Sequence, residues 1–199
     1  MHPTRPALPL LALLVAASGC SAVKMSRVRD DYATVDRNQT KRLVVVTSPL
    51  PADDARVGEL WSLIARRYVN QNRDFIAKES RVAESLASPT DACGEGLEGV
   101  LHLKPEVAKL EAKGAQVGVF AQLVRCTDGA EVWAASGGAS WDSQNALYDA
   151  QRAQYVSELG EEVGPWVAPS FQLLKSVLET LPNPELNDDD VVEKIELGE

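Results

Sequence analysis

The sequence predicts an α/β (α+β) fold with a single mixed sheet of about five strands and two or three packing helices. Three observations predict it. A β-branched run at 43–47 is followed by an amphipathic helical segment and then by a second short strand-like run at 74–80. An alternating segment at 116–126 and its return at 131–141 are joined by a turn sequence. An apolar helical pattern near the C-terminus offers a helix that can lie across the sheet.

The chain begins with a short positive segment and an apolar run from Ala7 to Ala17. This run of 11 residues is too short to span a bilayer, which needs about 20. Its length and flanks are typical of a secretory signal peptide. Ala17, Ser18 and Gly19 then lead directly into Cys20.

This segment resembles the lipobox of bacterial lipoproteins, although Ala17 stands where Leu is usual. The resemblance implies that residues 1–19 are removed and that Cys20 carries a diacylglyceryl group. An ordinary signal peptide with an incidental cysteine is the alternative. Ser21 follows Cys20, where an Asp would favour the inner membrane. The resemblance therefore implies an outer membrane lipoprotein that faces the periplasm, with the inner membrane or the cell surface as alternatives.

The 180 residues that remain after the leader suit one domain. Their composition limits the classes of molecule that can be a partner. The chain has 20 basic and 29 acidic residues, and without the leader its net charge is near −10. Such an acidic chain repels phosphate backbones, so nucleic acid is not expected as a partner. No basic cluster grips anionic lipid, so membrane lipid is expected to be contacted through acylated Cys20.

Two cysteines remain once Cys20 is acylated. Cys93 and Cys126 are expected to pair in an oxidising envelope compartment. The bond would close a loop of about 34 residues and contribute roughly 3–4 kcal/mol in the chain-entropy model. Two separate buried thiols are the alternative.

The expected domain boundaries follow from changes in composition. Residues 20–41 are polar and lack a period, which predicts a lipidated tether with a reach of about 25 Å. The α/β domain is expected over 42–182. Residues 183–199 are acidic and are expected to form a solvated or frayed tail.

The first half of the domain is expected to alternate strand, helix and strand. Residues 43–47 predict a strand covered on both faces. Asp53 and Asp54 are expected to open a helix, whose apolar face carries Val57, Leu60, Trp61, Ile64 and Tyr68. A second strand is expected over 74–80, and a loop over 85–99.

The second half is expected to contain the clearest hairpin. A short strand over 100–103 is expected to end at Pro105, followed at 106–113 by helical turns or a surface loop. Strands over 116–126 and 131–141 are joined by Thr127, Asp128 and Gly129, and the returning strand is expected to bulge at Gly137 and Gly138.

The C-terminal part is expected to be helical. Residues 143–159 predict an exposed helix. A helix from Trp166, with Pro169 in its first turn and Pro182 after its end, is expected to pack across the sheet.

A search for catalytic groups predicts no enzyme, cofactor or metal site. His102 is the only histidine after leader removal, which excludes a histidine-rich zinc site, and no G-x-S-x-G motif occurs. Gly94, Gly96 and Gly99 lack the Lys-Ser/Thr of a phosphate loop. The consecutive acids at 188–190 lack the alternate spacing of a calcium loop.

The four tryptophans divide by pattern. Trp61 and Trp166 lie on apolar helical faces and are expected in the core. Trp133 and Trp141 share one parity on the hairpin strand. Burial is the commoner outcome for such residues, and an exposed partner surface is the alternative.

The pattern over 43–141 resembles the α/β module of the TolB amino-terminal domain, the curli-secretion lipoprotein and the lipoprotein activators of penicillin-binding proteins. Its marks are the strand LVVVT, the amphipathic helix and the hairpin VGVFAQLVRCTDGAEVWAASG. The mature chain, including SPLP and PWVAPSFQLLKSVLETLPNPEL, is similar to an uncharacterised family of myxobacterial-type lipoproteins. These resemblances imply a non-enzymatic lipoprotein that binds an envelope protein. A secretion-pore subunit, an activator of cell-wall synthesis and a hydrolytic envelope enzyme are the alternatives.

Overall fold

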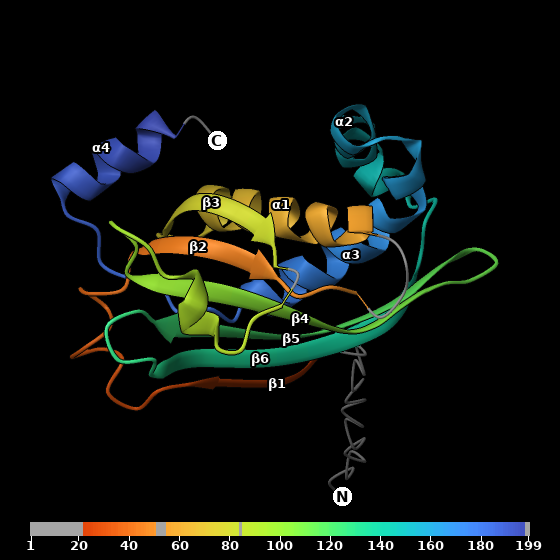
Figure 1. Cartoon of the computed structure of the whole chain (residues 1–199). Coiled ribbons are helices and arrows are strands. Elements are labelled where there is room, and N and C mark those ends of the chain that lie inside the picture. The colour runs from red at the N-terminus through yellow and green to blue at the C-terminus, as the bar shows by residue number, and fades with distance from the viewer. Residues whose placement is uncertain (1–21, 51–54, 84, 198–199) are drawn as a thin grey trace, which may run out of the picture.

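The computed structural model describes residues 22–50, 55–83 and 85–197. In this part of the chain, one six-stranded sheet has the strand order β1-β6-β5-β4-β2-β3 (Figure 1). Its strands are β1 Val23–Val28, β2 Arg42–Thr47, β3 Ile76–Val82, β4 Gly99–Leu110, β5 Gly114–Arg125 and β6 Glu131–Asp142. The helices are α1 Ala55–Asn72, α2 Asp149–Leu159, α3 Gly164–Leu178 and α4 Asp188–Glu196, with short 3₁₀ helices η1 Pro89–Ala92, η2 Ala146–Tyr148 and η3 Glu161–Val163.

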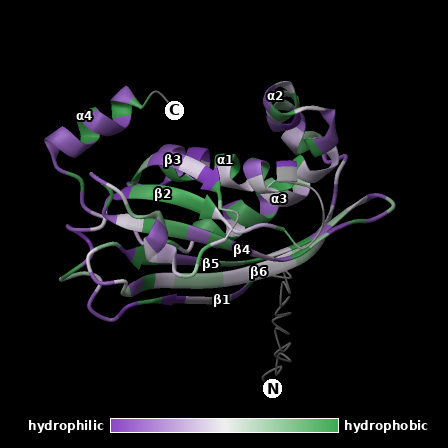
Figure 2. Ribbon diagram, viewed as in Figure 1, coloured by the Kyte–Doolittle hydropathy of each residue, from purple (hydrophilic) through white to green (hydrophobic). Residues whose placement is uncertain are grey.

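The sheet is mixed, as the sequence predicts. β2 runs parallel to β3 and β4, and the other pairs are antiparallel. Helices α1 and α3 pack against the same face of the sheet (Figure 1). Hydrophobic residues concentrate on the central strands beneath these helices, while α2 and α4 carry more hydrophilic residues (Figure 2). No helix among the described residues is long and apolar enough to cross a membrane.

The prediction of a tether is wrong for residues 22–41, which belong to the folded domain. β1 pairs antiparallel with β6 and forms the sixth strand, one more than predicted. After it, residues 30–39 form turns in which Tyr32 and Asp36 are buried. The Arg125 guanidinium donates to the Asp36 carboxylate at 2.8 Å. Because β1 lies at an edge of the sheet, most of its side chains are exposed, and its apolar alternation is limited to Val23 and Met25.

The prediction that Pro105 ends the third strand is also wrong, and residues 106–110 are strand instead of helical turns or loop. β4 continues to Leu110, with a register shift between Pro105 and Val107 opposite β5. Beyond Leu103, β4 pairs with β5 but has lost β2 on its other side. Proline is tolerated at such a free edge, and at bulges, because no ladder hydrogen bond needs its missing N–H.

The segment before β4 covers the second face of the sheet. Ala92 from η1 packs with Val44, Val46 and Val100 in a small apolar cluster. A disulfide bond joins Cys93 to Cys126, with their Cα atoms 5.8 Å apart. The pairing inferred from the cysteine count is therefore present, and it holds the η1 segment against the end of β5.

Helix α3 lies across β5 and β6, but its proline is not where the sequence suggests. Pro165 occupies the first turn, and Pro169 lies inside the helix. Because Pro169 has no N–H, the carbonyl of Pro165 lacks its helical partner. The Ser143 hydroxyl donates to that carbonyl at 2.5 Å. Next to Pro169, Ser170 accepts a hydrogen bond from the Trp61 indole at 2.8 Å, which ties α3 to α1.

The acidic tail is folded, in contrast to the prediction. Asn187 and Asp190 form a capping box at the start of α4. Asp190 is buried and accepts from Lys41 at 2.6 Å and from Arg42 at 2.7 Å. Burial alone would raise the pKa of Asp190, but these hydrogen bonds and that of the Asn187 backbone outweigh it and lower this pKa to about 2. The tail's negative charge thus has specific basic partners on β2.

The two glycines of β6 mark a close approach instead of the expected bulge. Gly137 and Gly138 pair with β5 in regular register, and the extra residue lies on β1, whose register with β6 shifts between Val23 and Met25. A β-carbon on Gly137 would lie 2.7 Å from the Ala22 carbonyl oxygen and 2.8 Å from Val177 Cγ2. Gly137 therefore lets the segment before β1 and helix α3 both pack against β6.

We expect Gly137→Ala to lower the free energy of unfolding by about 1–3 kcal/mol, because the methyl group would overlap backbone and core atoms. Gly118→Ala is the matched control, since a β-carbon there would have no neighbour closer than 3.6 Å. Urea unfolding measures both variants. Equal stability of the two would contradict the close approach at Gly137.

Candidate functional site

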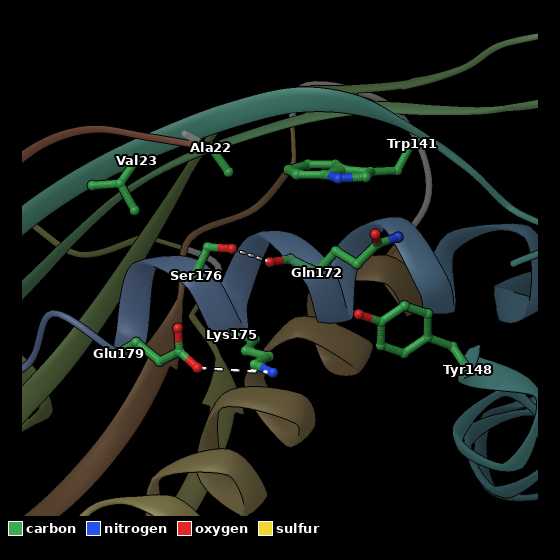
Figure 3. Close-up of a pocket in the computed structure, with 8 residues that line it drawn as sticks. All are labelled: Ala22, Val23, Trp141, Tyr148, Gln172, Lys175, Ser176 and Glu179. Atoms are coloured by element: carbon green, nitrogen blue, oxygen red, sulfur yellow. Dashed lines mark hydrogen bonds and ion pairs between the residues drawn. The ribbon is translucent and has the colours of Figure 1, made fainter. Parts of the chain in front are cut away.

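A groove of about 460 Å³ lies between the end of β6, the exposed side of α3 and the start of β1 (Figure 3). Its lining combines two aromatic side chains with several polar ones: Ala22, Val23, Trp141, Tyr148, Gln172, Lys175, Ser176 and Glu179. The groove therefore joins residues from both ends of the chain and from the hairpin between them.

Two aromatic rings form the apolar part of the groove. Trp141 comes from the end of β6, and its indole extends over the side of α3 (Figure 3). It is partly buried against the core, so one part of the ring is held and another is open to the groove. Tyr148 comes from η2, and its ring packs on Phe171 with centroids 5.5 Å apart. Both rings are thus positioned before any ligand arrives.

The polar part of the groove is one side of α3. Residues 172, 175, 176 and 179 are spaced by three, one and three, so they share one helical face. The Ser176 hydroxyl donates to the Gln172 carbonyl at 2.8 Å, and the Gln172 amide nitrogen donates to the Ala168 carbonyl at 3.2 Å. In both bonds the side chain of Gln172 or Ser176 is the donor. The side-chain oxygens of these two residues therefore remain as acceptors toward the groove.

One positive and one negative group stand at the same face. Lys175 Nζ lies 3.8 Å from Glu179 Oε1, with both side chains about half exposed, so the pair is weak. The Tyr68 hydroxyl also donates to Glu179 Oε1 at 3.3 Å. The groove consequently has no strong net charge, although the whole chain is acidic.

The predicted lipidation residue, Cys20, lies outside the described residues. Ala22, two residues later, lines the groove and accepts a hydrogen bond from Gly138 N–H at 2.8 Å. Ala22 is therefore part of the folded domain instead of a tether with a reach of about 25 Å.

Of the two hairpin tryptophans, Trp133 is buried, which is the commoner outcome expected, and the alternative of a partner surface is wrong for it. Trp133 is completely buried, and its indole N–H donates to Thr180 Oγ1 at 3.2 Å, so it cannot contact a partner. Trp133 lies near the start of β6, beside the residues that follow α3, whereas Trp141 lies near the end of β6 and is only partly buried. Trp61 and Trp166 are buried, as predicted.

His102 has the neighbours of a catalytic base but the wrong hydrogen-bond direction. Its Nε2 lies 2.7 Å from Ser48 Oγ, and the Gln122 amide nitrogen lies 3.3 Å from its Nδ1. An amide nitrogen donates, so Nδ1 accepts and Nε2 carries the proton that is donated to Ser48. A general base would need the opposite tautomer. Burial, helped by Lys104, lowers the pKa of His102 to about 4, which keeps the ring neutral.

Metal-binding groups are not gathered in the part of the chain that the structure describes. No cluster of three or more His, Cys, Asp or Glu side chains there is placed to hold an ion. Of the consecutive acids at 188–190, Asp190 is engaged by Lys41 and Arg42.

The polar stripe on α3 and Tyr148 are groove residues that the sequence did not predict. A signal was present, because polar residues recur at helical spacing within an otherwise apolar helix. It could not show that this stripe faces Trp141.

Comparisons with known proteins give structural likenesses alone. No protein-family model matches the chain, and no curated protein matches it. A PelC dodecamer from Paraburkholderia phytofirmans is 20% identical, with 80% of this chain and 99% of that chain covered and a TM-score of 0.43. The hypothetical protein CT253 from Chlamydia trachomatis is 10% identical, with 70% and 94% covered and a TM-score of 0.45. Lipoprotein GNA1162 from Neisseria meningitidis is 15% identical, with 62% and 97% covered and a TM-score of 0.39.

We expect the stability of the protein to fall between pH 6.5 and pH 4 because of His102. Its pKa in the folded state is about 4, below the ordinary 6.5, so the unfolded chain binds this proton first as the pH falls. The loss at pH 4.5 is roughly 2 kcal/mol relative to pH 7. Urea unfolding at both pH values measures it, and His102→Gln should reduce the pH dependence. An identical pH dependence in the variant would refute the assignment.

Proposed function

We propose that this chain is a non-catalytic lipoprotein of the bacterial envelope, anchored through acylated Cys20, that binds a partner in the groove at Trp141. In this proposal the lipid anchors the chain in the outer membrane, with the domain facing the periplasm. The observation that carries it is the position of Ala22. This residue lines the groove and lies two residues after Cys20, so the binding site and the anchor share one end of the domain.

The aromatic side chains support binding at the groove. Trp61, Trp133 and Trp166 are buried in the core, and two of them donate hydrogen bonds to α3 or the residues just after it. Trp141 keeps part of its ring open beside polar groups that have acceptor capacity left. An aromatic ring held at the rim of a polar groove is a common anchor in recognition surfaces.

The arrangement of titratable groups supports a role without catalysis. The Ser48 hydroxyl accepts a hydrogen bond from His102 Nε2 instead of donating one to it, so Ser48 is not activated as a nucleophile. The carboxylates with lowered pKa values, Asp128, Asp190 and Glu193, are each paired with Arg or Lys side chains. These ion pairs explain the lowered pKa values of the three carboxylates without a catalytic role.

The Cys20→Ser variant tests the anchor. We expect it to move from the membrane fraction to the soluble fraction, because acyl chains provide the membrane affinity. Fractionation of cell envelopes followed by detergent extraction measures this change. A variant that still sediments with envelope vesicles would contradict the proposal.

Photo-crosslinking tests the groove. A benzophenone amino acid at Lys175 should give crosslinked products in intact cells, whereas one at Glu79 on β3, at the other edge of the sheet, should give few. The two side chains are matched in exposure, 48% and 51%. Immunoblots of crosslinked envelopes would show the products, and equal yields at both positions would argue against the groove as the binding site.

A further inference from the structure

We propose that the groove binds the sugar rings of an uncharged glycan, with one ring stacked on the Trp141 indole. This inference rests on the proposed function of the groove as a binding site and names its ligand. The chemistry of the lining, the charge of the site and its place in the molecule support it in turn.

A sugar ring presents a face of C–H groups and an edge of hydroxyl groups, and the groove offers a partner for each. The indole of Trp141 spreads over the side of α3, so a flat ring can lie against it (Figure 3). Tyr148 is fixed by Phe171 and adds a second aromatic wall with a hydroxyl at its tip. Because both rings are already held in place, stacking costs little side-chain entropy.

The hydrogen-bonding groups of the groove suit hydroxyls, which both donate and accept. Gln172 and Ser176 have used donors on backbone carbonyls and present oxygens as acceptors. Lys175 supplies N–H donors from the same helical face. A sugar hydroxyl satisfies either kind of group, so the polar side of the groove need not be left unpaired on binding.

The balance of charge selects against other ligands. A phosphate-bearing ligand would meet one Lys at the groove, accompanied by Glu179 at 3.8 Å, in a chain of net charge −9. An acyl chain would desolvate Gln172, Ser176 and Lys175 without replacing their hydrogen bonds with water. An uncharged ligand with many hydroxyls avoids the charge repulsion and replaces the hydrogen bonds that the groove loses to water.

The groove also has room beside the stacking position. Trp141 borders a second hollow of about 220 Å³, which Glu111, Lys113, Gly114, Ser140 and Asp142 complete. Polar groups therefore continue past the indole toward the β4–β5 turn. This continuity favours a chain of several sugar rings over a single monosaccharide.

The sugar rings could come from two sources. Since Ala22 lines the groove and Cys20 precedes it by two residues, a glycolipid headgroup in the anchoring membrane is within reach. A soluble polysaccharide that passes along the membrane presents the same chemistry. The experiment below has one arm for each source.

The test uses the full chain, purified from envelopes in detergent. In the first arm, isothermal titration calorimetry with cellotetraose, maltotetraose and chitotetraose measures the dissociation constants. In the second arm, the Cys20→Ser chain is sedimented with phosphatidylethanolamine–phosphatidylglycerol vesicles with and without diglucosyldiacylglycerol, an uncharged glycolipid. This variant cannot be held on the vesicles by its own lipid.

We expect binding in at least one arm, and Trp141→Ala should weaken it about tenfold through loss of the stacking face. Trp141→Tyr, which keeps a flat ring, should recover part of the affinity. Leu147→Ala is the control, because Leu147 is 82% exposed and does not line the groove. Thermal unfolding of each variant verifies that it is folded.

Two results would overturn the proposal. One is that no oligosaccharide releases or absorbs heat on titration and that vesicle binding does not depend on the uncharged glycolipid. The other is a folded Trp141→Ala variant that binds as well as the unaltered chain. If in either case the crosslinker at Lys175 still captures an envelope protein, the groove binds protein instead, so the glycan inference fails while the proposed function stands.

Discussion

The close approach at Gly137 is the constraint on which the rest of the structure depends. Three parts of the chain meet there: the carbonyl of Ala22 before β1, the Val177 side chain of α3 and the β6 backbone. If the β6 backbone carried a side chain at this point, α3 and the segment before β1 could not both reach the sheet. The groove has the same three walls, since Ala22, Trp141 and the polar side of α3 line it. Packing at one glycine thus sets the geometry of the candidate site.

Buried charges hold the two ends of the chain in place. Asp36, after β1, is fully buried and accepts from Arg125 of β5. Asp190, at the start of α4, is bound by Lys41 and Arg42 at the start of β2. Removing either member of such a pair leaves an unpaired buried charge, which costs more than the pair contributes. These pairs therefore specify where the terminal segments lie, besides any stability that they add.

The folding of the N-terminal segment changes the functional picture. A flexible tether would let the domain move freely some 25 Å from the membrane and engage partners in any orientation. With Ala22 already hydrogen-bonded to Gly138, an acyl group on Cys20 would hold one particular end of the domain at the lipid surface. The groove, with its open indole and polar helix side, is at that end. Anchoring and recognition would then be geometrically coupled.

The sequence alone determined the features that depend on local pattern. The β-branched run of β2, the alternating strands of β5 and β6 and the apolar stripes of α1 and α3 could be inferred, because burial imposes a period on the chain. The pairing of Cys93 with Cys126 could be inferred from the cysteine count, because only these two remain besides Cys20. The sequence also predicts a signal peptide before Cys20. Tertiary structure decided the rest. β1 and α4 are held by edge pairing and by ion pairs with distant residues, and no local pattern in the sequence shows which partners they find. Trp133 and Trp141 have the same local sequence pattern. Only the packing of the folded chain makes Trp133 part of the core and leaves Trp141 partly open to the groove.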